Sequence, residues 1–194
     1  MSSIRTFQAV FMDRDGTLGG SDEVILPGSF ELFPFTQPAL EKLKNAQIPI
    51  FSFTNQPGIS RGEVQKQDFE DELTSFGFDK IYLCPHLNGE GCSCRKPSTG
   101  LLVQAAQEHN LDLKNCVVIG DRWTDMLAAH RAGCMKILVK TGSGEKDLEK
   151  YSHNRFFGEW LDANPDYLAE NVLDAINWLL RLEAAGDGQK QEGI

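Results

Sequence analysis

The segment QAVFMDRDGT, residues 8–17, is the first indication of the fold class of this chain. It opens on a nearly continuous apolar run, which is typical of a strand buried on both faces of a parallel sheet. Asp13 and Asp15 follow and are two residues apart, so in an extended chain they project toward the same side. Gly16 then lets the backbone turn and approach a ligand closely. An Asp-Gly turn after a strand is common in itself, so the segment alone fits a plain turn equally well.

Similar apolar runs recur along the chain, at IPIFSF (48–53), KIYLC (80–84), CVVIG (116–120) and KILV (136–139). Between them lie helical patterns, at about 36–46, 61–76, 99–110 and 123–132. Strands that alternate with helices indicate βαβ units, and therefore an α/β fold with a Rossmann-like parallel sheet sandwiched by helices. The stretch NPDYLAENVLDAINWLLRLEAA predicts a last helix, with Asn164 as its N-cap and Pro165 as its first residue.

The length and composition predict a single soluble domain. A chain of 194 residues suits one well-cored domain, which we expect over 1–185. The segment 186–194, GDGQKQEGI, has nothing to bury, and we expect a disordered tail.

Charge, hydropathy and cysteine usage restrict the partners and the compartment. The net charge of −9 argues against nucleic-acid binding, and an anionic substrate would need local cations. No apolar run approaches the roughly 20 residues that a membrane-spanning helix needs, and no signal peptide is evident. Five cysteines without such a signal indicate a reducing compartment. These features predict a cytoplasmic protein with no membrane partner.

Polar side chains follow four of the five predicted strands, where the chemistry of an open parallel sheet gathers. Two carboxylates as close as Asp13 and Asp15 repel each other unless a cation lies between them or one is protonated. Thr54 and Asn55 end the second strand with a hydroxyl and an amide, which alone would be an ordinary turn.

The other two polar groups complete this pattern. Arg95 and Lys96 come after the third strand, and Asp121 comes directly after the fourth. Asp125 fits the first turn of the following helix, where the macrodipole favours a carboxylate. Acidic, hydroxyl, basic and acidic groups at successive strand ends predict a phosphate-and-magnesium site.

The segment CPHLNGEGCSCRKP, residues 84–97, carries a second metal signal. Four soft or borderline ligands fall within it: Cys84, His86, Cys92 and Cys94. They make a full tetrahedral set for zinc with no open position, which is typical of a structural site. Zinc would fold this loop, which has little apolar content, and would fix the backbone that leads into Arg95 and Lys96. We expect the other two cysteines, Cys116 and Cys134, to be packing residues.

The motifs DRDGT, TNQ, RKP and GDRWTD, in this order, resemble the four motifs of the haloacid-dehalogenase-like (HAD) phosphatases. With CPH and CSC added, the chain resembles the zinc-containing, small-cap branch of that family, which acts on heptose 1,7-bisphosphate or histidinol phosphate. The resemblance runs from about Phe7 to Gly142. The segments after the first two strands are short, so we expect no cap domain, and hydrolysis is favoured over phosphomutase chemistry.

The resemblance implies a role for each motif residue. Asp13 would be the nucleophile that becomes aspartyl-phosphate, and Asp15 the general acid and base. Mg²⁺ would be held by Asp13, the backbone carbonyl of Asp15, and Asp121. The phosphoryl group would be stabilised by Thr54 and Lys96, and the substrate contacted by Asn55, Arg95 and Arg122.

Two alternatives remain open at this level. The short zinc loop resembles the histidinol-phosphate enzymes, whereas TNQPGISRG (54–62) and LVKTGSG (138–144) resemble the heptose enzymes, and Gly19 departs from both. A zinc-stabilised binding protein with little turnover is the alternative outside the enzymes. The aromatic segment HNRFFGEW (153–160) would pack over the sheet edge or shape the substrate entrance.

Overall fold

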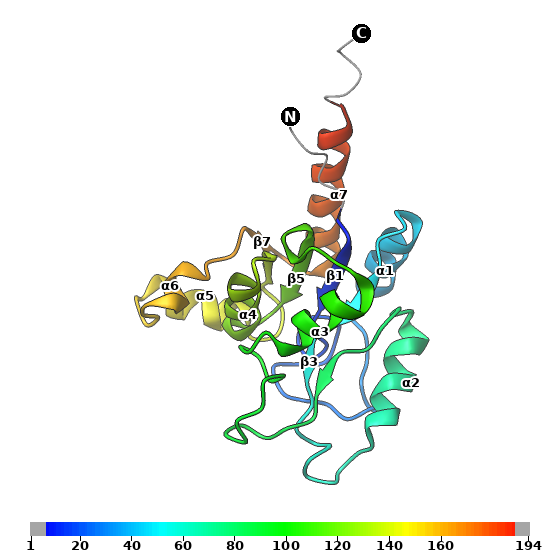
Figure 1. The fold of residues 1–194 in the computed structure, drawn as a ribbon, viewed down its shortest axis with the longest axis vertical. Coiled ribbons are helices and arrows are strands. Elements are labelled where there is room, and N and C mark those ends of the chain that lie inside the picture. The colour runs from blue at the N-terminus through cyan, green and yellow to red at the C-terminus, as the bar shows by residue number, and fades with distance from the viewer. Residues whose placement is uncertain (1–6, 189–194) are drawn as a thin grey trace.

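The computed structural model describes residues 7–188, with side chains for 7–185, and is built on a five-stranded parallel sheet (Figure 1). The strand order is β2-β1-β5-β6-β7, and a separate parallel pair is formed by β3 and β4. The strands of the large sheet are β1 (Ala9–Met12), β2 (Ile50–Ser52), β5 (Cys116–Gly120), β6 (Met135–Val139) and β7 (Tyr167–Ala169). The small pair consists of β3 (Thr54–Asn55) and β4 (Leu83–Cys84).

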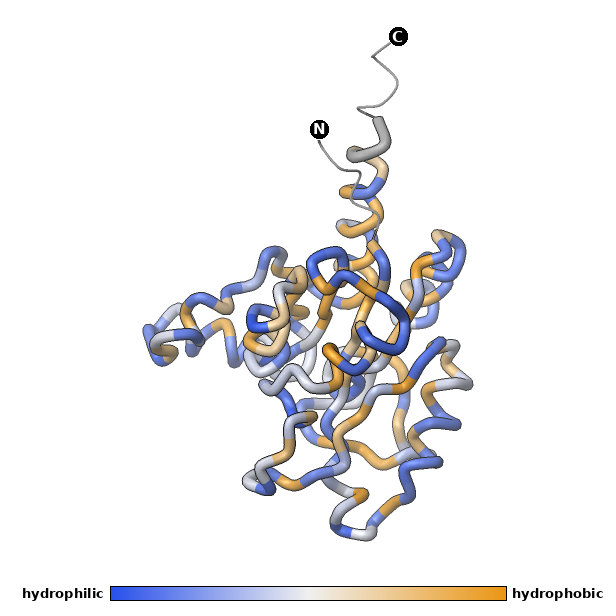
Figure 2. The backbone as a smooth tube through the Cα atoms, in the orientation of Figure 1, coloured by the Kyte–Doolittle hydropathy of each residue, from blue (hydrophilic) through white to orange (hydrophobic). Residues whose placement is uncertain are grey.

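Helices cover both faces of the large sheet, as the alternation of strand and helix predicts. They are α1 (Thr36–Asn45), α2 (Lys66–Phe76), α3 (Gly100–His109), α4 (Trp123–Ala132), α5 (Gly144–Ser152), α6 (Glu159–Asp162) and α7 (Val172–Gly188). A single 3₁₀ turn, η1 (Leu113–Asn115), leads into β5. Hydrophobic and hydrophilic residues alternate along α7, as an amphipathic helix requires (Figure 2).

Side chains on the two faces of β1 pack against different helices, which shows which helices cover each face of the sheet. Val10 and Met12 belong to a core shared with α1 and α7, whereas Ala9 and Phe11 belong to a core shared with α3 and α4. All four are fully buried. Because successive residues of a strand point to opposite faces, a strand buried on both faces must be apolar throughout.

The predicted strands 48–53 and 80–84 are shorter than expected, and the second lies outside the large sheet. The chain leaves the sheet after Ser52, so that Thr54 pairs with Leu83 instead. The Ser52 hydroxyl donates to the Tyr82 carbonyl at 3.1 Å and accepts from the Tyr82 amide at 2.8 Å. The Ser52 side chain therefore takes the place of one ladder hydrogen bond, that of the Tyr82 amide, and interrupts the regular pairing of the two segments.

The second predicted helix begins at Lys66 and not at 61. Gly62 has φ +70°, which interrupts a right-handed helix. Gln65 then caps α2, and its backbone amide donates to the Asp68 carboxylate at 3.0 Å. Residues 61–65 of the predicted helix are therefore part of the loop before α2.

The predicted start of the last helix at Asn164 and Pro165 is wrong. Tyr167–Ala169 form β7, which pairs with β6 at the sheet edge, and the helix begins only at Val172. Asn171 accepts from the Asp174 amide at 3.1 Å and so performs the capping assigned to Asn164. The helix α7 extends to Gly188, and the rest of the predicted tail, 189–194, lies outside the described residues.

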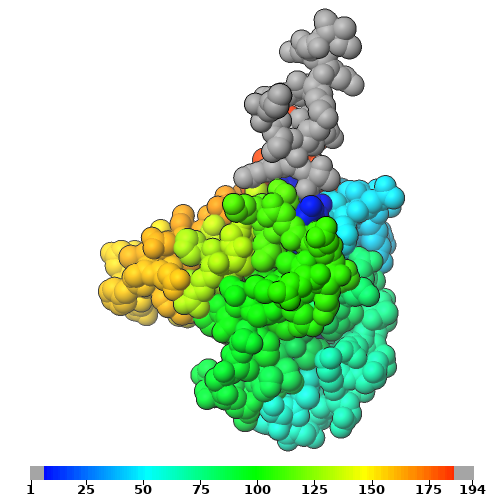
Figure 3. Space-filling model, viewed as in Figure 1, coloured from blue at the N-terminus to red at the C-terminus, as the bar shows by residue number. Residues whose placement is uncertain are grey.

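The segment from α5 to α6 projects sideways from the body, in yellow and orange in Figure 3. It holds the predicted aromatic cluster, in which Phe156 stacks on Trp123 with ring centroids 4.8 Å apart and on Trp160 at 5.7 Å. The Trp123 indole also donates to the Trp160 carbonyl at 2.6 Å. The aromatic residues therefore anchor the start of α4 to this projection. No helix in residues 7–188 is long and apolar enough to cross a membrane.

Candidate active site

The carboxyl ends of β1 and β5 meet at the point where the strand order reverses. The chain passes from β1 to β2 on one side, and β5 lies on the other side of β1. The Asp13 amide donates to the Ile119 carbonyl at 3.0 Å, which places Asp13 beside the end of β5. Asp121 directly follows that end. This is the position where open α/β sheets bind ligands.

Three buried carboxylates gather there, those of Asp13, Asp121 and Asp125, each with an oxygen within 4.8 Å of the others. Sequence reasoning missed Asp125, which it assigned to the first turn of a helix. Asp125 has that role too, because it accepts from the Arg122 amide at 3.1 Å. The sequence did contain a signal for this position. Asp125 lies four residues beyond Asp121, in the first turn of the next helix, which places its carboxylate near the strand end.

Lys96 is the cation at the centre of this carboxylate cluster. Its Nζ lies 2.9 Å from Asp13 Oδ1 and 2.6 Å from Asp125 Oδ1, and it donates to the Phe53 carbonyl at 2.8 Å. An ammonium has three N–H donors, so these contacts use all of them. The Lys96 amide donates to Asn55 Oδ1 at 3.1 Å, which fixes the backbone as well. Burial acts against the charge of Lys96, but the carboxylates of Asp125 and Asp13 outweigh it and raise its pKa.

The cluster carries more negative charge than Lys96 can balance. Burial, followed by the charges of Asp13 and Asp125, raises the pKa of Asp121 well above its ordinary value. Burial also raises the pKa of Asp125 to about 6, against the lowering effect of Lys96. Three carboxylates and one ammonium leave an excess of two negative charges when all are ionised. A hard divalent cation with oxygen ligands fits this donor set in both charge and chemistry.

The backbone approaches the Asp121 carboxylate closely at two glycines. Gly16 and Gly142 have φ values of +79° and +56°, and a Cβ on either would overlap Asp121 Oδ2. The same oxygen accepts from the Ser143 amide at 2.7 Å. The loops that follow β1 and β6 therefore hold this carboxylate in one orientation.

The Asp15 carboxyl does not join the carboxylate cluster. Its Oδ1 accepts from Arg14 Nη1 at 2.7 Å and from the Ile25 amide at 2.9 Å. Its Oδ2 accepts from Gln56 Nε2 at 2.8 Å, and this nitrogen also lies 2.9 Å from Thr54 Oγ1. Burial raises the pKa of Asp15, although Arg14 opposes the shift. The predicted role of its backbone carbonyl as a metal ligand stays a prediction.

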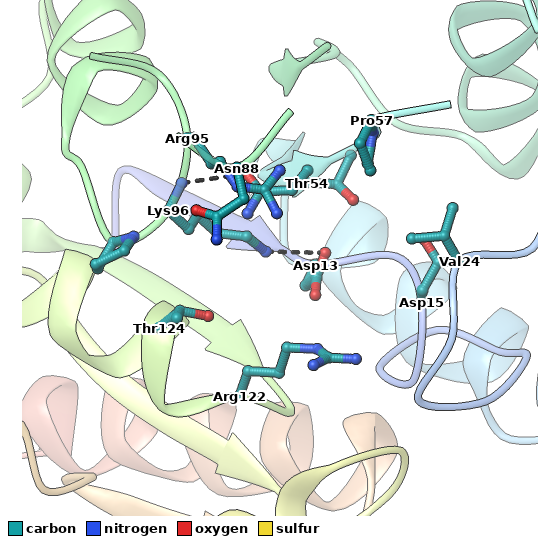
Figure 4. A pocket seen from close by; sticks show the side chains of 12 residues that line it. Asp13, Asp15, Val24, Thr54, Pro57, Asn88, Arg95, Lys96, Arg122 and Thr124 are labelled. Carbon is teal, nitrogen blue, oxygen red and sulfur yellow. Dashed lines mark hydrogen bonds and ion pairs between the residues drawn. The ribbon is translucent and has the colours of Figure 1, made fainter. Parts of the chain in front are cut away.

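A pocket of about 370 Å³ opens over these groups (Figure 4). Seven residues that the sequence singled out line it: Asp13, Asp15, Thr54, Asn55, Arg95, Lys96 and Arg122. Five further residues were not foreseen: Val24, Pro57, Asn88, Pro97 and Thr124. Asp121 lies beneath the pocket, fully buried, and the lining contains no residue of the segment 153–160.

Two guanidinium groups lie on different sides of Asp13 in Figure 4. Arg95 Nη1 donates to the His86 carbonyl at 3.0 Å, which ties it to the loop 84–97. Arg122 Nη2 donates to the Asp22 carbonyl, in the loop that follows β1. Since Lys96 is fully engaged by Asp13 and Asp125, these two arginines are the cations with donors left for a ligand in the pocket lining.

The four predicted zinc ligands meet on the loop 84–97: Cys84, His86, Cys92 and Cys94. Sulfur–sulfur distances are 3.2 Å from Cys94 to Cys84 and 3.7 Å from Cys84 to Cys92, and His86 Nδ1 lies 3.2 Å from Cys94 Sγ. A tetrahedral zinc with Zn–S bonds of about 2.3 Å would separate its sulfurs by about 3.8 Å. The separation of Cys84 and Cys92 matches this value, whereas Cys84 and Cys94 would have to move slightly apart to hold zinc. Burial raises the pKa of the Cys84 thiol, so a metal ion would be needed to hold it as a thiolate.

The fold and the site define a hydrolase with a Rossmann-like core and acidic strand ends, and the comparisons agree. The model for haloacid dehalogenase-like hydrolases matches residues 21–133, and a second model of HAD-like hydrolases matches 93–175. The chain belongs to the haloacid dehalogenase-like hydrolase family.

Its relatives are sugar phosphatases. A D-glycero-D-manno-heptose-1,7-bisphosphate 7-phosphatase of Thermosynechococcus vestitus is 34% identical, over 88% of this chain and 94% of its own length. A D-glycero-alpha-D-manno-heptose-1,7-bisphosphate 7-phosphatase of Campylobacter jejuni is 37% identical, over 76% and 91%. The crystal structure of D,D-heptose 1,7-bisphosphate phosphatase from B. bronchiseptica, complexed with magnesium and phosphate, superposes with a TM-score of 0.74 at 29% identity, over 89% of this chain and 98% of that one. The expectation of a phosphatase of this family is confirmed.

Proposed function

We propose that this chain removes the 7-phosphate of a heptose 1,7-bisphosphate through an aspartyl-phosphate on Asp13. The observation that carries the proposal is the combination of charges in one pocket. The carboxylates and Lys96 suit transfer of one phosphoryl group, while Arg95 and Arg122 have donors left for a second anionic group. Arginine guanidinium groups match phosphate geometry well.

The residues divide the reaction between them. The Asp13 carboxylate attacks phosphorus, and it is held in place through Oδ1 by Lys96 Nζ at 2.9 Å and by the Arg14 amide at 2.8 Å. The hydroxyl of Thr54 positions an equatorial oxygen of the phosphoryl group, and the nearby positive charge of Lys96 stabilises the negative charge of that group. Asp15 protonates the leaving sugar oxygen and then takes a proton from the water that hydrolyses the aspartyl-phosphate. Asn55 keeps its amide nitrogen for the substrate, since its oxygen is occupied by the Lys96 amide.

Magnesium is the divalent cation that we propose for the carboxylate cluster. Asp13 and Asp121 would hold it together with the Asp15 carbonyl, and Asp125 completes the negative environment. When bound, it supplies positive charge to the phosphoryl oxygens and relieves the repulsion among the carboxylates. The relative from B. bronchiseptica was crystallised with magnesium and phosphate, which supports the choice of metal.

Zinc is the metal that we propose for the loop 84–97, in a structural role. Three thiols and one imidazole would supply all four ligands of a tetrahedral zinc and leave no position for substrate or water. The loop contributes Asn88, Arg95 and Lys96 to the pocket. Zinc would act on the reaction through the placement of these groups.

The charges in the pocket favour a heptose bisphosphate over histidinol phosphate as the substrate. Histidinol phosphate carries an ammonium group, which Arg95 and Arg122 would repel, whereas a second phosphate would be attracted. A binding protein without turnover would have no need for an acid–base carboxyl set apart from the carboxylate cluster, as Asp15 is. Curated relatives are named for the alpha or the beta anomer, and both belong in a test.

The test is phosphate release by the purified protein with and without magnesium, on both anomers of heptose 1,7-bisphosphate and on histidinol phosphate. We expect magnesium-dependent formation of heptose 1-phosphate, with kcat/KM at least about 100-fold above that for histidinol phosphate. Replacement of Arg122 by Met should raise KM for the bisphosphate more than for 4-nitrophenyl phosphate, which has no second phosphate. A preference for histidinol phosphate would contradict the proposed heptose substrate. Absence of turnover on every compound would contradict the proposal that the chain is an active enzyme.

We also propose a single-domain organisation and a reducing compartment for this chain. We treat 1–185 as one domain, since the cores on both faces of the sheet share its strands. The five cysteines are all free thiols, which agrees with a reducing compartment such as the cytoplasm.

A further inference from the structure

Arg14 is fully buried and lies between the two aspartates of the first motif, yet the proposed chemistry assigns it no role. Its guanidinium group does not line the pocket over the carboxylate cluster. It enters a space between α2 and the loop that follows β1, where its guanidinium carbon lies 3.6 Å from the ring centroid of Phe30 and 5.1 Å from that of Phe69. A buried cation in such a place is costly unless its partners are well arranged.

The partners of Arg14 are arranged as a fork. Nη1 donates to Asp15 Oδ1 at 2.7 Å and to the Ile25 carbonyl at 2.7 Å. Nε donates to Glu72 Oε2 at 2.8 Å, and Nη2 lies 2.7 Å from the same oxygen. Glu72 belongs to α2, and its side chain is 11% exposed. The planar guanidinium thus joins a carboxylate on the helix to the carboxyl of Asp15.

These contacts decide which oxygen of Asp15 is available for proton transfer. Oδ1 already accepts from Arg14 Nη1 and from the Ile25 amide, so both of its lone-pair positions are used. Oδ2 accepts only from Gln56 among the described residues, so one position stays open. Fixing Oδ1 therefore fixes the plane of the carboxyl and the direction in which Oδ2 offers a proton.

We propose that Arg14 and Glu72 form a buried positioning pair, which locks Asp15 Oδ1 so that Oδ2 serves as the acid–base oxygen. This inference rests on the proposed role of Asp15. Glu72 acts through Arg14, because it engages Nε and Nη2 and leaves Nη1 to point at Asp15. Neither residue touches the substrate. Lysine cannot replace arginine here, since one ammonium cannot reach three acceptors in a planar fork.

The experiment compares two substrates with different leaving groups, heptose 1,7-bisphosphate and 4-nitrophenyl phosphate. An alkyl oxygen needs protonation to leave, whereas nitrophenolate does not. A displaced Asp15 should therefore slow the alkyl substrate far more. We expect Arg14→Lys to lower the ratio of the two kcat/KM values by about 10- to 100-fold, as small misplacements of catalytic groups do. Glu72→Gln should lower the ratio in the same direction by a smaller factor.

The ratio is insensitive to partial unfolding, because the amount of folded enzyme cancels between substrates measured on one preparation. A merely structural role for Arg14 would lower both rates together and leave the ratio unchanged. Glu70→Gln is the matched control, since Glu70 lies on the same helix in a surface ion pair with Lys66 and should leave the ratio at the wild-type value.

Asp15→Asn separates this inference from the proposed function. If Asp15→Asn lowers the ratio and the Arg14 and Glu72 variants do not, the positioning pair is refuted and the role of Asp15 stands. If Asp15→Asn itself leaves the ratio unchanged, the acid–base assignment fails and the positioning pair fails with it. A lowered ratio in all three variants, with Glu70→Gln unchanged, supports both.

Discussion

The carboxylate cluster and the zinc loop are both candidate metal sites, but they depend on the fold in opposite ways. Asp13, Asp121 and Asp125 are fixed by strand ends and helix starts that are packed on both faces, so the fold brings like charges together. The loop 84–97 has few buried apolar side chains, and what brings its ends close is the cluster of four potential zinc ligands.

A metal ion would therefore contribute differently at the two sites. At the carboxylate cluster the fold holds the ligands against their mutual repulsion, so a cation there gains its binding energy from charge and is placed for chemistry. At the loop the ligands have little else to hold them, so the binding energy of the metal is folding energy. Substitutions in the two sites, and the pH dependence of stability, would therefore be expected to respond differently.

The first prediction is that Asp13→Asn removes activity and leaves the fold intact. Asparagine cannot form an aspartyl-phosphate, so turnover should fall by at least about 10⁴-fold. Circular dichroism and the melting temperature should stay close to wild type, because the strands that hold the position are unchanged. Asp71→Asn, on the surface of α2, is the matched control and should be fully active. Turnover near the wild-type rate by Asp13→Asn would refute the covalent mechanism.

The second prediction is that Cys92→Ser loosens the loop 84–97, with a loss of activity that follows from the loss of structure. We expect about one zinc per chain in the wild type, less in the variant, a lower melting temperature, and a rate loss of about 10²-fold as Arg95 and Lys96 move. Added magnesium should not restore the rate, since it prefers oxygen ligands. Cys116→Ser, outside the loop, should keep the zinc. A catalytic zinc would show the opposite pattern, with activity lost on chelation and the melting temperature unchanged.

The third prediction concerns Asp125, which the sequence pattern assigned to a helix turn alone. Asp125→Asn keeps a hydrogen-bonding group at the start of α4 but removes a charge beside the proposed magnesium ligands. The magnesium concentration for half-maximal activity should rise by about 10- to 100-fold, as is usual when support around a metal is removed. An unchanged magnesium requirement would show that Asp125 only caps the start of α4 and pairs with Lys96.

The fourth prediction is a pH dependence of stability in protein without added magnesium. Burial raises the folded-state pKa of Asp125 to about 6, above its ordinary value of 3.8, so the folded protein binds this proton more tightly than the unfolded chain. The resulting penalty is absent below the ordinary pKa, grows as the pH rises from there to about 6, and stays constant at higher pH. Asp121, shifted in the same direction, adds to it.

Without magnesium, the melting temperature should therefore fall by about 2–4 °C for each kcal/mol of penalty as the pH rises from about 4 to about 7. Saturating magnesium should flatten this slope, because it neutralises the carboxylates. A melting temperature that rises over this range without magnesium would contradict the assigned shifts.

Much of the fold and of the candidate site could be predicted from the sequence because the signals are local. A continuous apolar run followed by a carboxylate indicates a buried strand and its end, as at Met12–Asp13 and Gly120–Asp121. The spacing of the thiols and imidazole within the loop 84–97 indicates a zinc set without any knowledge of the fold.

What could not be predicted depends on contacts between distant segments. β7 is a strand because β6 offers it an open edge, and the same residues read alone suit a helix start. The partner of Arg14 is Glu72, 58 residues away on a helix surface that looks like any other amphipathic pattern. The sequence places Asp125 on a helix, but its contact with Lys96 needs the loop 84–97 to return to the sheet.

The contact of Gly16 and Gly142 with Asp121 has a consequence for how this protein can change by mutation. Neither glycine takes part in the reaction, yet a side chain at either position would displace a carboxylate of the cluster. In a library that replaces each residue in turn, both positions should tolerate as little as the aspartates do. The loop between β6 and α5 is also fixed in length, because one inserted or deleted residue would put a side chain where Gly142 now lies. A short surface connection, the kind of segment in which lineages usually gain and lose residues, is here as constrained as the core.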